Sequence, residues 1–124
     1  ENGVRYGDLP EFVDFAYAAR IAGVAVAALA HAASAPEAPR GVVIDVSGLA
    51  HDTTLRWEPG GEADLAGYRV VWRATTEPVW THFRDFGPVT EATLPLSKDD
   101  LMFGVQARDR DGHLSPAVIP VPKR

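Results

Sequence analysis

The chain has 124 residues, which is enough for one domain of ordinary size or for a small domain with an appendage. Hydrophobic residues make up 46% of it and charged residues 23%, a balance typical of a globular protein rather than a disordered one. The net charge of −5 and the lack of a basic run argue against nucleic acid and anionic membranes as partners. Because the chain has no cysteine, a disulfide framework and a thiolate zinc site are excluded.

The N-terminal part has the composition of one long helix. Asp8 suits an N-cap, Glu11 follows it at capping-box spacing, and Pro10 lies in the first turn, where its missing N–H costs nothing. Between Ala16 and Ala35, 11 of 20 residues are alanine, the strongest helix former. The sequence therefore predicts a helix from about Leu9 to about Ala33.

Large apolar side chains are spread round most of the surface of this predicted helix: Phe12, Val13, Phe15, Tyr17, Ile21, Val24, Val26 and Leu29. A helix with apolar side chains on nearly all sides is usually buried on nearly all sides. Three interpretations compete: a membrane span, a signal peptide ending in the small residues 30–35, and the last core helix of a larger domain. Arg20 and His31 interrupt the apolar run, and the first twenty residues are acidic and aromatic. We therefore favour the core helix and expect no membrane span.

After the helix, the sequence period changes from that of a helix to that of strands. Residues 1–35 are assigned to the truncated end of an upstream domain, residues 36–40 to an Ala/Pro linker, and residues 41–124 to a separate domain. Alternating apolar and polar residues, bounded by Pro, Gly, Asp and Ser, predict strands at about 41–47, 52–58, 66–75, 79–86, 90–95, 101–109 and 114–121. Seven short strands at regular spacing indicate an antiparallel sandwich.

Several spaced anchors give this sandwich a family resemblance. They are Trp57, the run Gly67-Tyr68-x-Val70-x-Trp72, the run Phe103-x-Val105-x-Ala107, and the tail from Asp109 to Pro116. With them, residues 39–122 resemble a fibronectin type III domain, a seven-stranded immunoglobulin-like sandwich. Leu101 occupies the position where that family usually has the tyrosine of the tyrosine corner, so a hydrogen bond worth about 1 kcal/mol is expected to be lost. Leu101→Tyr is accordingly predicted to stabilise the domain.

The segment from Gly7 to Phe15 carries a second resemblance. Its sequence, Gly-Asp-Leu-Pro-Glu-Phe-Val-Asp-Phe, followed by Tyr17 and an Ala/Val-rich helix, is similar to the end of the bacterial zinc-dependent aminopeptidase family. In those co-catalytic di-zinc exopeptidases such a segment opens the final helix of the catalytic domain, shortly after the last metal-binding histidine. Some members carry a type III-like domain after that helix. The resemblance implies that zinc and the catalytic residues belong to a parent domain and that the protein is periplasmic or secreted.

The histidines and acidic residues of the chain give no catalytic or metal motif. His31, His51, His82 and His113 never pair at three, four or five residues, so no helical or finger-type zinc spacing exists. The stretch from Asp109 to Gly112 echoes only part of a calcium loop and is better explained as a hairpin turn. Asp99 and Asp100 are adjacent and fit a solvated turn. We therefore predict no catalytic residue, no metal ligand and no cofactor in this chain.

Aromatic residues of the fourth predicted strand are the remaining candidates for a binding surface. Trp80, His82, Arg84 and Phe86 alternate along that strand and are predicted to share one face, whereas Phe83 points the other way. An exposed aromatic face suits protein or sugar binding. The competing interpretation is cross-strand packing that shields the core.

Three functional hypotheses follow. The first is a non-catalytic accessory domain of a zinc aminopeptidase-like protein, acting as a spacer, as a module docking on its own catalytic domain, or as a contact for protein or peptide. The second is a carbohydrate or cell-surface module that binds polysaccharide through Trp80. The third is a free-standing structural protein. Under any of them the exposed Ala-rich helix is expected to make this fragment self-associate.

Overall fold

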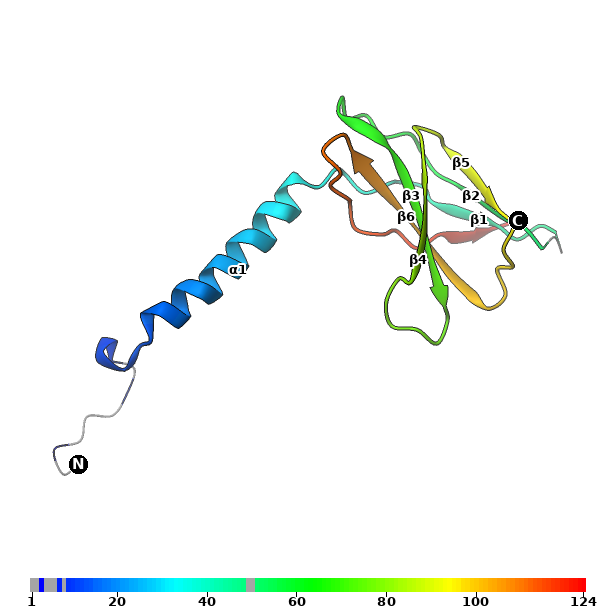
Figure 1. The fold of residues 1–124 in the computed structure, drawn as a ribbon. Coiled ribbons are helices and arrows are strands. Elements are labelled where there is room, and N and C mark those ends of the chain that lie inside the picture. The colour runs from blue at the N-terminus through cyan, green and yellow to red at the C-terminus, as the bar shows by residue number, and fades with distance from the viewer. Residues whose placement is uncertain (1–2, 4–6, 8, 49–50) are drawn as a thin grey trace. The chain divides into compact units, whose positions relative to one another are not determined.

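The computed structural model describes residues 3, 7, 9–48 and 51–124. The chain divides into two compact units, residues 1–33 and residues 34–124. In the described part, one short 3-10 helix and one α-helix precede seven strands. The second unit is the predicted two-sheet sandwich (Figure 1).

The long helix begins later than predicted. A 3-10 turn, η1, covers Pro10–Phe12, and the α-helix α1 covers Phe15–Ser34. The N-cap is Asp14, whose Oδ1 accepts a hydrogen bond of 2.9 Å from the backbone N–H of Tyr17. Asp8, the predicted cap, lies outside the described residues. The predicted start at Leu9 is wrong, because the chain turns once as a 3-10 helix and is extended at Val13 before α1 begins.

The sandwich has seven strands: β1 (Val43–Asp45), β2 (Thr53–Arg56), β3 (Leu65–Ala74), β4 (His82–Phe86), β5 (Glu91–Leu94), β6 (Leu101–Asp109) and β7 (Val121–Lys123). One sheet has the order β5-β2-β1-β7 and the other the order β4-β3-β6. All pairings between named strands are antiparallel except β1 with β7, which is parallel. The prediction of a purely antiparallel sandwich is therefore wrong at its last strand.

The core is built by inward-facing residues of both sheets. Leu55, Val70 and Val105 are fully buried, and the rings of Trp57 and Tyr68 pack with their centroids 5.2 Å apart. These are the anchor positions of the sequence pattern, so period two alone located the buried face. The hydroxyl of Tyr68 also accepts a 2.7 Å hydrogen bond from the N–H of Gly60, which fixes the loop between β2 and β3.

The region predicted as the seventh strand, residues 114–121, is divided between the two sheets. Residues 114–118 pair with β6 only at isolated bridges, Arg108 with Leu114 and Val105 with Val118. Pro116 cannot donate to a ladder. Beside it, the N–H of Ala107 donates a 2.9 Å hydrogen bond to the Ser115 hydroxyl rather than to a backbone carbonyl. Beyond this interruption the chain passes to the other sheet and forms β7 beside β1.

The residues predicted as a linker pack on the sandwich. Pro36 and Pro39 are buried, and the carbonyl of Arg40 accepts a 2.9 Å bond from the N–H of Glu58. The N–H of Glu37 donates to the Glu62 carboxylate at 3.0 Å. Residues 36–40 thus form an integral part of the second unit rather than a free spacer.

Candidate functional site

The outer face of the three-stranded sheet carries an unusual mixture of arginine and aromatic side chains. Along β3, Arg69, Val71 and Arg73 alternate with the buried Val70, so they point away from the core. Val71 is nevertheless only 4% exposed. Something on the outer face must therefore cover it.

Trp80 provides this cover. A Cβ atom placed on Gly104 of β6 would lie 3.1 Å from Cζ2 of Trp80 and 3.1 Å from Cγ2 of Val71. The indole therefore lies against the bare backbone of Gly104, next to Val71, which is the residue opposite Gly104 in the β3–β6 register. A Cβ here would make a tight contact that the ring could relieve only by shifting a few tenths of an ångström. Phe83 of β4, opposite Val71 on the other side, is 59% exposed.

Two guanidinium groups lie on these rings. The Cζ atom of Arg69 is 4.0 Å from the centroid of Phe83, and that of Arg73 is 5.5 Å from the centroid of Trp80. Arg69 also makes a bidentate pair with Asp85, at 2.6 and 2.9 Å. The hydrogen bonds from Arg69 hold the pKa of Asp85 below its ordinary value, although burial acts in the opposite direction.

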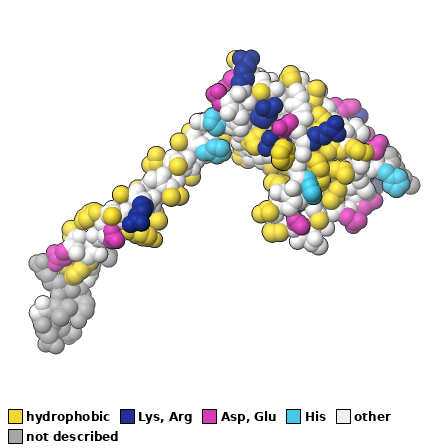
Figure 2. Space-filling view, in the orientation of Figure 1, with side chains coloured by type: hydrophobic (Ala, Val, Ile, Leu, Met, Phe, Trp, Pro, Cys, Tyr) yellow, Lys and Arg dark blue, Asp and Glu magenta, His cyan; other side chains and the backbone are white. Residues whose placement is uncertain are grey.

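We call this surface the aromatic–arginine face, defined by Arg69, Val71, Arg73, Trp80 and Phe83. Figure 2 shows basic and hydrophobic side chains gathered over β3 and β4 on the side in view. Tryptophan and arginine are the side chains that most often anchor protein interfaces, and here their positions are fixed before any partner arrives. The face is therefore the best-formed candidate interaction surface among the described residues.

The four residues predicted to share one binding face do not do so. His82 is opposite Trp72 and stacks on it with centroids 5.7 Å apart, and Phe86 is opposite Tyr68, so both follow the alternation of the core residues. Arg84 lies between them in the same alternation, with its guanidinium 5.5 Å from the Phe86 ring. Trp80 lies on the opposite, outer face. The predicted alternation fails because β4 begins at His82, so Trp80 is in the preceding loop and outside the strand register.

The sequence contained a signal for this surface that the prediction missed. Arg69 and Arg73 flank Val71 at period two on a strand whose other residues are core anchors. An outward Arg-x-Val-x-Arg pattern indicates a basic outer face with an apolar centre. Gly104, at an outward position of β6, marks where a ring can approach the backbone.

The described residues form no metal site that includes the histidines. Among residues 3, 7, 9–48 and 51–124, no group of three or more His, Asp or Glu side chains could hold a metal ion. His113 instead pairs with Asp109 across the turn after β6, with 2.8 Å between Nδ1 and Oδ2. Burial raises the pKa of Asp109, but the hydrogen bonds from His113 outweigh it, so the pKa stays below the ordinary value of 3.8. This pair fastens the turn after β6.

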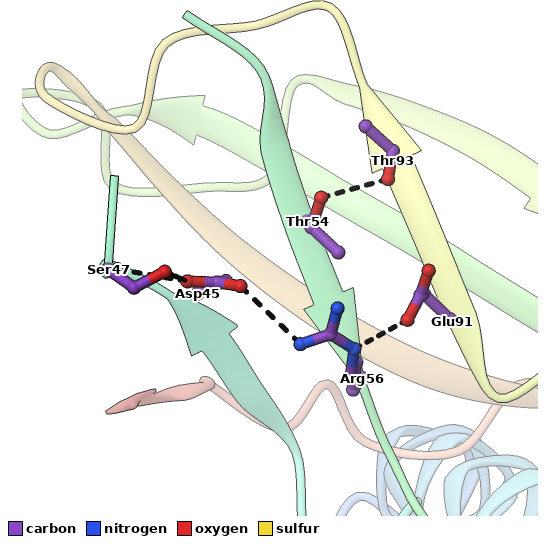
Figure 3. A network of polar contacts seen from close by, with 6 residues as sticks. All are labelled: Asp45, Ser47, Thr54, Arg56, Glu91 and Thr93. Atoms are coloured by element: carbon purple, nitrogen blue, oxygen red, sulfur yellow. Dashed lines mark hydrogen bonds and ion pairs between the residues drawn. The ribbon is translucent and has the colours of Figure 1, made fainter. Parts of the chain in front are cut away.

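The outer face of the four-stranded sheet has a different character (Figure 3). Arg56 bridges Asp45 of β1 and Glu91 of β5, and Asp45 also accepts hydrogen bonds from Ser47. The hydrogen bonds from Ser47 are the main cause that lowers the pKa of Asp45. These charged side chains are already paired with one another at the solvent-exposed surface, where ion pairs contribute little to stability or affinity. The network holds no aromatic ring, and this face is a weaker candidate.

The helix α1 has no buried residue. Its six large apolar side chains are each more than half exposed, from 53% for Ile21 to 70% for Val24 and Leu29. Figure 2 shows hydrophobic side chains along its whole length. By length and composition α1 is apolar enough to cross a membrane, a property that it shares with signal sequences and with the core helices of soluble proteins.

Taken together, these features define a fibronectin type III-like sandwich with an attached apolar helix. The fold resembles the crystal structure of an Fn3-like protein from Clostridium thermocellum, with a TM-score of 0.55 at 17% identity over 73% of this chain and 97% of that one. It also resembles part of the structure of titin kinase and its flanking domains, with a TM-score of 0.53 at 24% identity over 72% of this chain and 16% of that one. These likenesses confirm the predicted fold class. No family model matches the sequence.

Sequence relatives come from fungi and are much longer. The chain is 49% identical over 122 residues to a protein of Leptosphaeria maculans named "Probable zinc metalloprotease", and 47% identical over 122 residues to one of that name from Pyrenophora tritici-repentis. Each match covers 98% of this chain but only 28% and 25% of the relative. The chain thus spans about a quarter of the length of these relatives. The match includes α1 as well as the sandwich.

Proposed function

We propose that this chain is a non-catalytic accessory part of a longer zinc metalloprotease. In this proposal the sandwich docks on the catalytic domain or contacts protein or peptide, and any zinc belongs to the catalytic domain. The observation that carries the proposal is the match of almost the whole chain to one quarter of relatives named zinc metalloproteases. It is supported by the exposed apolar side chains of α1, which are typical of a helix taken from a larger core.

A narrower proposal concerns the type of protease. The segment from Gly7 to Phe15 resembles bacterial di-zinc aminopeptidases, whereas the curated relatives are fungal and their names state only a metalloprotease. We propose an exopeptidase for the longer protein on the strength of that segment alone. From the same resemblance we propose that the protein acts outside the cytoplasm, secreted or periplasmic.

Protein or peptide suits the aromatic–arginine face better than polysaccharide. A sugar ring stacks on a free aromatic face, but Trp80 packs on Gly104 and one side of Phe83 is covered by Arg69. What remains accessible is mainly Phe83, which is 59% exposed, beside the side chains of Asp85 and Arg69, which are 38% and 21% exposed. This mixture matches the composition of protein interfaces.

The experiment uses the full-length protein, a version ending before Pro36, and the chain described here. Zinc content and hydrolysis of aminoacyl and internal peptide substrates are measured for each. We expect zinc and activity in the first two and neither in the third, with the shortened version less able to process folded protein or long peptide substrates. A full-length protein without zinc, or hydrolysis by the isolated chain, would overturn the proposal.

Trp80→Ala in the full-length protein then distinguishes the possible roles of the sandwich. Loss of activity on large substrates alone would support a contact with protein or peptide. Binding to insoluble polysaccharides that disappears in the variant would instead favour the carbohydrate hypothesis.

A further inference from the structure

The true start of α1 changes the distribution of its apolar side chains. Phe12 lies in η1 and Val13 is extended, so neither belongs to the helix that begins at Phe15. On a continuous helix with about 100° per residue, these two side chains would point to the same side as Arg20 and His31. Their removal from the helix leaves that side without large apolar groups.

The six large apolar residues of α1 then fall on one side. Tyr17, Ile21 and Val24 form one ridge at spacings of three and four, and Phe15, Val26 and Leu29 form a second ridge beside it. Together the ridges span roughly 200° of the helix circumference at 100° per residue.

The opposite side has a different composition. Arg20 and His31 are eleven residues apart, which is about three turns, so they point in nearly the same direction. Arg20 and His31 lie at one margin of this side, next to Val24, and the rest of it as far as Val26 carries only small residues: Ala16, Ala19, Gly23, Ala27, Ala30 and Ser34. Nε of Arg20 donates to the carbonyl of Ala16 at 3.3 Å, so its guanidinium stays along this side. We call this side the polar stripe.

We infer that α1 is one-sided, with its two apolar ridges covered by the rest of the longer polypeptide and its polar stripe facing water. The inference rests on the proposed function for the identity of the cover. Relatives that match α1 and the sandwich contain about three times as much additional chain, which is ample for a domain that buries these ridges.

A membrane fits this helix less well than a protein cover does. A membrane span surrounds the helix on all sides and would place Arg20 about 7 Å from the middle of a 20-residue span. The polar stripe is better explained if one side of the helix remains in water. A second copy of the chain is the other alternative, and protein concentration separates it from a cover within the same polypeptide.

The test is cysteine accessibility in the full-length protein. Ile21→Cys, Val26→Cys and Leu29→Cys report on the ridges, and Arg20→Cys, Ala27→Cys and His31→Cys are matched controls on the polar stripe. Maleimide labelling is followed at each site by peptide mass spectrometry, so cysteines elsewhere do not interfere. We expect ridge positions to react at least about tenfold more slowly than stripe positions in buffer and equally fast in urea. Hydroxyl-radical footprinting of the unmodified protein gives the same comparison if a variant fails to fold.

Each other outcome overturns the inference. Equal protection of both sides would mean burial all round, and equal reactivity would mean that nothing covers the helix. Protection that appears only with lipid vesicles, or only at high protein concentration, would replace the proposed cover by a membrane or a second copy. Zinc is measured in the same samples: one-sided protection without zinc would overturn the metalloprotease assignment alone, and lack of protection in a zinc-containing protein would overturn only the helix inference.

Discussion

Thr53 provides the clearest test of what holds the sandwich together. It is fully buried in β2, and its hydroxyl donates a 2.7 Å hydrogen bond to the carbonyl of Leu96 in the connection between β5 and β6. The tyrosine corner of type III domains fastens the chain just before the sixth strand through a side-chain hydroxyl, and Leu101 cannot do this. The structure shows a hydroxyl bonded to that connection from the opposite sheet.

Thr53→Val keeps the shape of the side chain and removes only the hydroxyl. It leaves the Leu96 carbonyl without this donor in a part-buried position, which costs about 1–2 kcal/mol. For a domain of this size the melting temperature falls by roughly 4–16 °C. We expect little change in fold, because valine suits a strand at least as well as threonine.

Thr54→Val is the matched control. Thr54 is the next residue on the same strand, but its hydroxyl bonds the Thr93 hydroxyl at 2.9 Å on the exposed face, where water replaces the lost partner (Figure 3). Its cost is expected to stay below about 0.5 kcal/mol. Thermal unfolding followed by circular dichroism measures both variants. Equal melting temperatures for the two would refute the reasoning, and in the Thr53→Val background we expect Leu101→Tyr to recover part of the loss.

Three further predictions follow from single contacts. In Gly104→Ala a Cβ would lie 3.1 Å from the Trp80 ring, so the ring must shift by a few tenths of an ångström; we expect about 1 kcal/mol of destabilisation and a red-shifted tryptophan emission. Tyr68→Phe leaves the N–H of Gly60 without its 2.7 Å partner and is expected to cost about 1 kcal/mol in urea unfolding. Because the pKa of Asp109 is lowered on folding, its carboxylate stabilises the fold above the ordinary value of 3.8, and this contribution is lost as the pH falls through the lower folded-state pKa. The melting temperature of Asp109→Asn should therefore lie below wild type at pH 6, and the gap should narrow below pH 4; a constant gap would contradict the assignment.

The sandwich was predictable because the alternation of apolar and polar residues is repeated from strand to strand. Five of the seven predicted strands carry two or more inward apolar residues at period two, so an error at one position does not change the buried face. At Gly67, next to the core residue Tyr68, the structure also agrees with the sequence pattern in detail. Gly67 has φ +151°, and a Cβ there would lie 2.3 Å from the carbonyl oxygen of Phe86, so the glycine of the pattern is required by the close approach of β4.

The helix start was not predictable because two aspartates satisfy the same rule. Asp8 precedes Pro10 and Glu11, and Asp14 precedes the Ala-rich run, so both offer a side chain to a first turn. Local propensity cannot rank two such caps six residues apart. The 3-10 turn of η1 separates them, and Asp14 caps the longer helix.

The candidate interaction surface escaped the prediction for a related reason. Alternation assigns faces only within a continuous strand, and Trp80 lies two residues before β4 begins. Its position depends instead on a gap left by Gly104, a residue on a strand twenty-four positions later in the chain. Contacts of this kind are set by tertiary packing, and sequence period carries no information about them. A glycine at an outward position inside a strand is a local sign of such a contact, because this residue weakens a strand unless a ring or another backbone needs the space.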